Sequence, residues 1–175
     1  MEEAPTAGFT GHQDIGDVAT VEWVRATIRR EVALKAVGRW VTSLARGGDQ
    51  LFAECLAEMG KPYTVVVPCR LYEETFEGAA AKATYRRLLA QAESRETLPF
   101  EEPSETAFYA AGRRVVDCAD FMVAVWNGAP AKGLGGTGDV VGYSRSLGKP
   151  ILHIHNVDRT VTIEDQVAEE ISRAP

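Results

Sequence analysis

Short β-rich runs alternate with helix-length amphipathic segments along most of this 175-residue chain. Strands that alternate with helices in this way form βαβ units, which build a mainly parallel sheet with helices on both faces. Runs that are apolar throughout, such as Val65–Val67 and Phe121–Val125, fit strands that are buried on both sides. The alternation therefore predicts one doubly wound α/β domain, whose mainly parallel sheet has five strands or slightly more.

The spacing of apolar residues also predicts where the elements lie. The expected strands are Thr6–Thr10, Trp40–Leu44, Tyr63–Pro68, Phe121–Trp126 and Pro150–His155. The expected helices are Ala19–Val37, Gln50–Met59, Gly78–Ala92, Glu105–Cys118 and Gly138–Leu147. The charged segment Glu93–Glu105 is expected to be an exposed excursion. Residues 1–5 and 159–175 are expected to be peripheral, with a short final helix at Ile163–Ser172.

Charge and composition argue against several classes of protein. Nineteen Lys and Arg residues against 25 Asp and Glu residues give a net charge of -6, so the chain has no general attraction to nucleic acid or anionic lipid. The three cysteines, Cys55, Cys69 and Cys118, form no CxxC pair and are expected to be reduced thiols. No signal peptide and no apolar run of about 18 residues is recognised. We therefore expect a cytoplasmic protein with no membrane span, and nucleic acid is an unlikely partner.

In an open parallel sheet, ligands bind beyond the carboxyl ends of the strands, so the loops that follow the strands are the candidate site. Thr10, Gly11 and His12 follow the first expected strand and offer hydrogen-bond donors beside a glycine, although an ordinary turn fits them equally well. Arg46, Gly47, Gly48 and Asp49 follow the second. Their backbone N–H groups can face an anion, whereas a capping Asp49 beside a solvated Arg46 is the simpler interpretation.

The loop after Trp126 is the most informative of these segments. Gly133, Gly135, Gly136 and Gly138 fall within six residues, directly before an expected helix. Glycine loses the most conformational entropy on folding, so we expect a close approach of the backbone to a phosphate or ribose there, and a merely mobile loop is the alternative. Asp139 either caps the helix or accepts hydrogen bonds from sugar hydroxyls.

Other chemistry-bearing residues have simpler explanations. His153 and His155 share one face of the last expected strand, and without a clear third ligand they predict packed histidines and no metal site. Arg113 and Arg114 fit a solvated helix face. Cys69 is not expected to be a nucleophile, because no histidine that could act as its base lies near it in the sequence.

Four segments together resemble the SLOG superfamily: Phe9–His12, Ala45–Ala53, Asp120–Gly128 and Gly135–Val141. This superfamily contains the DNA-processing protein A, the Lonely-guy cytokinin-activating phosphoribohydrolases and many small bacterial proteins, to which this chain looks most similar. The resemblance extends from Phe9 to Ile154 and implies a Rossmann-like domain that binds a nucleotide or nucleotide-derived ligand. Relatives often self-associate, so a homodimer is a further expectation.

The resemblance leaves two functions open. The first is binding of a nucleoside monophosphate or an ADP-ribose-like molecule, with no separate cofactor. The second is N-glycosidic hydrolysis of a nucleoside monophosphate, with Asp139 and His12 as catalytic residues. In the phosphoribohydrolase motif PGGxGTxxE the Glu would fall at Val141 or Gly142, which favours binding. The expected ligand-binding residues are Thr10, Gly11, Arg46, Gly47, Gly48, Asp49, Asn127, Gly128, Gly135, Gly136, Thr137 and Gly138.

Overall fold

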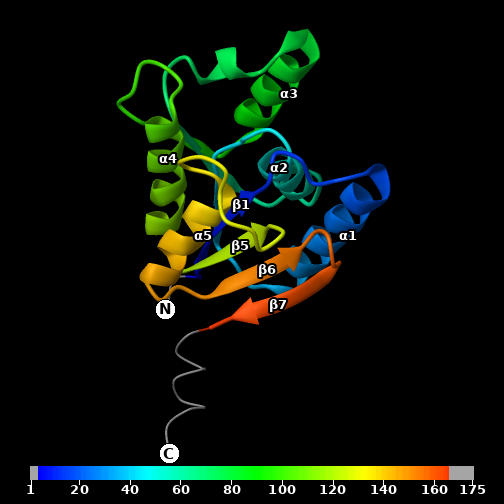
Figure 1. Ribbon diagram of the computed structural model, residues 1–175. Helices are drawn as coiled ribbons and strands as arrows, with labels where there is room; N and C mark the ends of the chain where they lie inside the picture. The colour runs from blue at the N-terminus through cyan, green and yellow to red at the C-terminus, as the bar shows by residue number, and fades with distance from the viewer. Residues whose placement is uncertain (1–3, 166–175) are drawn as a thin grey trace, which may run out of the picture.

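The computed structural model describes residues 4–165, which form a seven-stranded sheet with helices on both faces (Figure 1). The strands are β1 (Thr6–Gly11), β2 (Arg39–Thr42), β3 (Tyr63–Val67), β4 (Ser94–Thr97), β5 (Phe121–Val125), β6 (Ile151–His155) and β7 (Thr160–Glu164). The helices are α1 (Val18–Leu34), α2 (Gly48–Glu58), α3 (Gly78–Gln91), α4 (Glu105–Cys118) and α5 (Thr137–Ser146), with a 3-10 helix η1 (Tyr72–Thr75). The α/β class and the mainly parallel sheet predicted from the sequence are confirmed.

The strand order is β4-β3-β2-β1-β5-β6-β7, and every pair is parallel except β6 with β7. From β1 the chain builds outward to β4, then crosses back through α4 to place β5 on the other side of β1. The sheet therefore reverses its winding between β1 and β5. In doubly wound folds, this reversal opens a crevice at the carboxyl ends of the two strands.

Two hydrophobic clusters cover the two faces of the sheet. The larger holds buried residues of α1, α2 and α3, and its centre is Phe52, whose ring stacks on Phe9 with centroids 4.1 Å apart. The smaller holds residues of α4 and α5, including Val115 and Val140. Figure 1 shows α1 and α2 on one side of β1 and α4 and α5 on the other. The helices that follow β1 and β5 thus leave the reversal point in opposite directions.

Two strands were not predicted. β4 lies in the charged segment Glu93–Glu105, which is exposed here as predicted but forms an edge strand of the sheet instead of an excursion. Its exposed side chains carry no apolar pattern, and backbone pairing to β3 forms the strand, with hydrogen bonds from Glu93 N to Tyr63 O and from Leu98 N to Val67 O. β7 occupies Thr160–Glu164 as an antiparallel edge strand.

The final helix predicted at Ile163–Ser172 is wrong at its start, because Ile163 and Glu164 pair with β6 in the sheet. The remainder of that range, from residue 166, lies outside the described residues. Within residues 4–165 no helix has the length and apolar character needed to cross a membrane.

Candidate functional site

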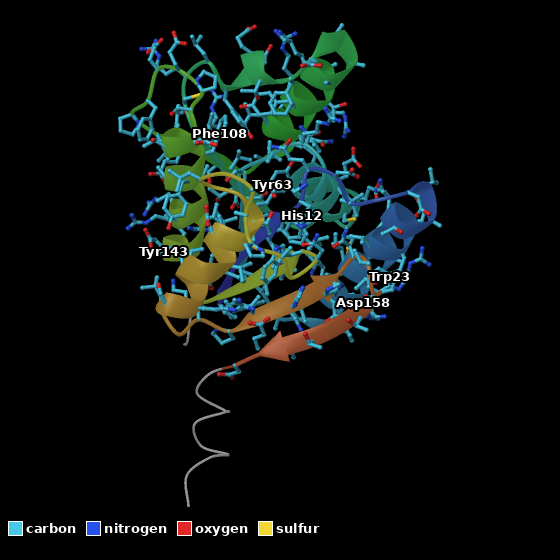
Figure 2. All side chains as sticks on the ribbon, viewed as in Figure 1. His12, Trp23, Tyr63, Phe108, Tyr143 and Asp158 are labelled. Atoms are coloured by element: carbon cyan, nitrogen blue, oxygen red, sulfur yellow. The ribbon has the colours of Figure 1, made fainter. Side chains whose placement is uncertain are left out.

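The loops after β1 and β5 meet at the point where the sheet reverses. His12 N donates to Val125 O at 3.0 Å, which continues the pairing of the two strands by one residue. Beyond it, His12 Nε2 lies 3.0 Å from Asn127 Oδ1 and 3.4 Å from Asn127 N. Figure 2 shows His12 near the middle of the molecule, where these loops converge. Two predicted site residues that are 115 positions apart are therefore in contact.

The loops after β1 and β2 pack backbone against backbone. Gly48 N donates to His12 O at 2.9 Å, and a Cβ on Gly48 would lie 3.0 Å from Gly11 Cα. Gly47 has φ +85, and a Cβ there would overlap the carbonyl of Gln13. These glycines allow α2 to begin directly beside the loop after β1, so packing between the loops alone accounts for Gly11, Gly47 and Gly48.

Asp49 is buried, with 4% of its surface exposed, in the first turn of α2. Its Oδ2 accepts hydrogen bonds from Ser43 N at 3.2 Å and Ala45 N at 3.4 Å, and the carboxyl group also receives the Thr42 hydroxyl and the Gly11 N–H. Burial raises the pKa of Asp49 to about 7, against the opposing effect of these donors. The side chain thus ties the ends of β1 and β2 to α2 and is not open to the crevice.

The loop from β5 to α5 is anchored at its start. Trp126 Nε1 donates to Ala129 O at 2.8 Å, and Ala129 N donates to Asn127 Oδ1 at 3.0 Å. The buried Trp126 ring packs against His153, with centroids 5.3 Å apart, and the Arg145 guanidinium lies 5.3 Å from its centroid. These contacts fix the first turn of a loop whose next residues, 127–130, are exposed.

The glycines of this loop have a packing explanation, contrary to the argument that led us to expect only a ligand there. Gly135 has φ +88, and a Cβ on it would lie 2.7 Å from Tyr109 N in α4. A Cβ on Gly138 would lie 2.7 Å from Ala131 N, since residues 129–131 fold over the start of α5. Asp139 Oδ2 accepts from Gly135 N at 2.9 Å and holds the loop against the first turn of α5.

The remaining predicted residues surround this junction. Thr137 is buried and opens α5, Thr10 is half-buried at the end of β1, and Arg46 is exposed before α2. Gly128 has φ +79 and follows Asn127 in the loop.

Several side chains that could have served the site are engaged elsewhere. Arg114 Nε pairs with Glu96, and Arg113 lies over the Tyr143 ring, 4.6 Å from its centroid. Cys69 is buried, and desolvation raises the pKa of its thiol, so it is not a nucleophilic thiolate. No group of three His, Cys, Asp or Glu residues in the described part of the chain is placed to hold a metal ion.

Sequence reasoning missed Asn156, which follows β6. Its Nδ2 donates to Ile15 O at 2.8 Å and fixes the loop after β1, while its Oδ1 is buried without a partner among residues 4–165. The only signal was a polar residue directly after a predicted strand, at the edge where ligands bind.

The architecture is shared with several solved structures. DNA processing protein A from Streptococcus pneumoniae superposes with a TM-score of 0.63 at 15% identity over 86% of this chain and 50% of that one. A structure described as showing the single-stranded DNA binding mode of DNA processing protein A from Helicobacter pylori gives 0.61 at 16% identity over 97% of this chain and 73% of that one. The chain has the fold of DNA processing protein A. It spans about half the length of the first of these structures.

The molybdenum cofactor binding protein from Rippkaea orientalis also superposes, with a TM-score of 0.58 at 12% identity over 98% of this chain and 84% of that one. The resemblance drawn from the sequence motifs is thus confirmed at the level of the fold. No protein-family model matches the chain, and a search of curated protein sequences finds no significant match.

Proposed function

We propose that this chain binds a nucleotide or nucleotide-derived ligand, such as a nucleoside monophosphate or an ADP-ribose-like molecule, at the carboxyl ends of β1, β2 and β5. One observation carries the proposal: α2 and α5 both begin at glycines beside the reversal point, and His12 and Asn127 meet between them. Neighbouring strands lie about 5 Å apart, so the ends of β2 and β5, on either side of β1, are separated by about 10 Å. One ligand can therefore extend from the α5 start to the loop before α2, where the Gly48 N–H already donates to His12 O.

A helix start is suited to a phosphate group. The first N–H groups of a helix have no partner within the helix, and the helix dipole favours negative charge at this end. At α5 these groups belong to Thr137 and Gly138, with the Thr137 hydroxyl beside them, while Arg46 adds a positive charge near α2. We assign the phosphate to α5, whose start lies beside the exposed residues 127–130.

His12 and Asn127 supply the polar groups between the two helix starts. An imidazole and an amide can each donate and accept hydrogen bonds, so the pair suits ribose hydroxyls. In the proposed complex the contact between His12 and Asn127 is broken, and both side chains bind the ligand instead.

The solved structures with this fold include proteins described as binding a molybdenum cofactor or single-stranded DNA. The net charge of -6 favours a small ligand over a strand, because a strand needs many positive contacts to its phosphates. A single phosphate that binds at a helix start can be held by backbone N–H groups without a positively charged side chain.

The proposal is tested by thermal shift and calorimetry with nucleoside monophosphates, NAD, ADP-ribose and a single-stranded oligonucleotide. We expect a small nucleotide to raise the melting temperature by several degrees and His12→Ala and Asn127→Ala to weaken its binding, with the distant Asp117→Asn as control. If no nucleotide binds at millimolar concentration, the proposal is wrong. Binding of the oligonucleotide alone would replace it with a nucleic-acid function. Light scattering of the same sample tests the expected homodimer.

Hydrolysis of the N-glycosidic bond is the alternative, and the geometry favours binding without turnover. The Asp139 carboxylate accepts Gly135 N, and the His12 ring contacts Asn127, so both proposed catalytic groups are engaged in holding loops. Chromatography of each ligand after incubation decides between the two: intact ligand supports binding, and free base that disappears in Asp139→Asn shows hydrolysis.

A further inference from the structure

A pocket of about 280 Å³ lies on the α1 and α2 side of the proposed site. Its wall comes from the loop after β1 and from the start of α2; the lining residues are Gln13, Asp14, Ile15, Gly16, Val21, Gly47, Gln50, Leu51 and Glu54. Gly47 belongs both to this pocket and to the predicted phosphate-binding loops, so the pocket adjoins the proposed site. Pockets for whole drug-sized ligands span about 300–1,000 Å³, so this one suits one end of a ligand.

The lining combines apolar side chains with carboxylates. Ile15 and Leu51 are buried and Val21 is half-buried, so Val21 is the apolar side chain of the three that leaves most surface for an aromatic ring. No Lys or Arg is among the lining residues, whereas Asp14 and Glu54 both are. A phosphate is therefore repelled from this pocket, and a ring that carries hydrogen-bond donors is favoured.

The two carboxylates, Asp14 and Glu54, differ in how many hydrogen bonds and ion pairs they already accept from the protein. Glu54 lies between Arg25 and Arg87, at 3.1 and 3.2 Å, and its charge is offset by both. Asp14 is exposed and accepts one hydrogen bond, from Gly16 N to Oδ1 at 3.1 Å. A carboxylate has about four acceptor positions, so Asp14 has capacity for a donor from a ligand. Gln50 already donates its amide, through Nε2, to Leu44 O at 3.3 Å.

We propose that this pocket receives the base of the ligand and selects bases that carry an exocyclic amine, with Asp14 as the acceptor of that amine. The inference rests on the proposed nucleotide-binding function and adds the position and the chemical class of the base. The ring lies against Val21, Ile15 and Leu51, and the sugar leads past Gly47 toward His12. Asp14 is a specificity-determining residue in this arrangement.

Matched ligands test the proposal. Adenosine and purine riboside 5′-monophosphates differ only at C6, which carries an amine in the first and a hydrogen in the second, and ribose 5-phosphate lacks the base. We expect calorimetry to show that the adenosine compound binds about tenfold more tightly than the purine riboside compound, since a hydrogen bond to a charged group that is missing in one ligand has about this effect. Ribose 5-phosphate should bind more weakly than either.

Two variants locate the effect. Asp14→Asn keeps an oxygen for Gly16 N but removes the charge, and it should reduce the preference for the amine to less than about threefold. Val21→Phe fills the pocket and should weaken adenosine monophosphate at least about tenfold while leaving ribose 5-phosphate unchanged. The controls are Asp158→Asn, which makes the same charge change on an exposed turn, and Val18→Phe, on the exposed start of the same helix. Melting curves confirm that each variant is folded.

The outcomes separate the two proposals. Equal binding of the two purine nucleotides overturns the inference about the base and leaves nucleotide binding intact. An amine preference that survives in Asp14→Asn and Val21→Phe places the base elsewhere and also overturns it. Failure of all three ligands to bind overturns both proposals. A preference that is lost in Asp14→Asn but kept in Asp158→Asn supports the assignment.

Discussion

Two helices of this molecule begin with similar sequences and different structures. Gly47-Gly48-Asp49 leads into α2, and Gly135-Gly136-Thr137-Gly138-Asp139 leads into α5. At α2 the aspartate is buried and binds the ends of two strands, and the glycines are pressed against the neighbouring loop. At α5 the aspartate is half-buried and binds the N–H of Gly135 in its own loop, parts of which are exposed.

The difference shows that a glycine-rich helix start has two uses that look alike in sequence. At α2 the motif joins elements together and leaves little that a ligand could displace. At α5 the motif shapes a loop that includes the exposed residues 127–130 and is held mainly by contacts within itself. The predictions below test whether α2 is the rigid half of the site and α5 the adaptable half.

The largest expected effect is at Asp49. Asp49→Ala leaves buried N–H groups of Gly11, Ser43 and Ala45 without an acceptor, and each such group costs about 1–3 kcal/mol. We expect a loss of about 4 kcal/mol in the free energy of unfolding, measured by urea denaturation. Asp139→Ala is the counterpart and should cost about 1 kcal/mol, as loss of a helix cap does. Equal losses would remove the distinction between the two helix starts.

The second prediction concerns the glycine that precedes α2. Gly47→Ala places a Cβ into the Gln13 carbonyl at φ +85, so the backbone must shift, and we expect a loss of about 3 kcal/mol. Gly60→Ala is the matched control, because Gly60 also has positive φ, +64, but a Cβ there meets nothing within 4 Å. It should lose about 1 kcal/mol. If both variants lose the same amount, conformational strain alone explains Gly47 and the loop contact is unimportant.

The third prediction is a pH dependence. The pKa of Asp49 is raised to about 7 in the folded protein and is about 4 in the unfolded chain, so the folded state binds more protons between these values. The Asp49 contribution to stability is therefore fully present below about pH 4 and is lost as pH rises through 7. Denaturation midpoints from pH 5 to 8 should show this fall in the wild type and a smaller one in Asp49→Asn. An identical slope in both proteins would show that Asp49 does not titrate in this range.

The smallest expected effect is at the contact between the two halves. A double-mutant cycle of His12→Ala and Asn127→Ala should give a coupling energy of about 1 kcal/mol or less without ligand, because both side chains are partly exposed to solvent. With a bound nucleotide the coupling should shrink, since the ligand replaces the contact. A coupling that grows on binding would mean that the pair closes over the ligand.

The sequence predicted the parts of the fold whose stability comes from apolar burial. β1, β2, β3, β5 and β6 and all five α-helices carry that pattern. β4 consists of Ser94, Arg95, Glu96 and Thr97 and is held at the sheet edge by backbone pairing with β3. Its sequence has no alternating apolar pattern from which a strand could be predicted. β7 is an edge strand of the same kind, and its antiparallel direction follows from the short turn after β6.

The candidate site was predictable to the level of loops but not of contacts. The rule that ligands bind beyond strand ends selected the loops that hold His12 and Asn127, because strand order places β1 beside β5. The direction of Asp49 into the core could not be read from its position, because an aspartate in the first turn of a helix can cap the helix, face a ligand or, as here, bind the ends of neighbouring strands. Asn156 and the pocket beside Gly47 depend on how segments far apart in sequence approach each other.

The position of β1 between β2 and β5 has a consequence for the newly synthesised protein. His12 leaves the ribosome 115 residues ahead of its contact Asn127. At about 5–20 residues per second, this interval is on the order of ten seconds. During that time β1 can pair with β2, but its other edge stays unpaired until β5 emerges. The central strand of the mature sheet is thus an unpaired outer edge until β5 has been synthesised.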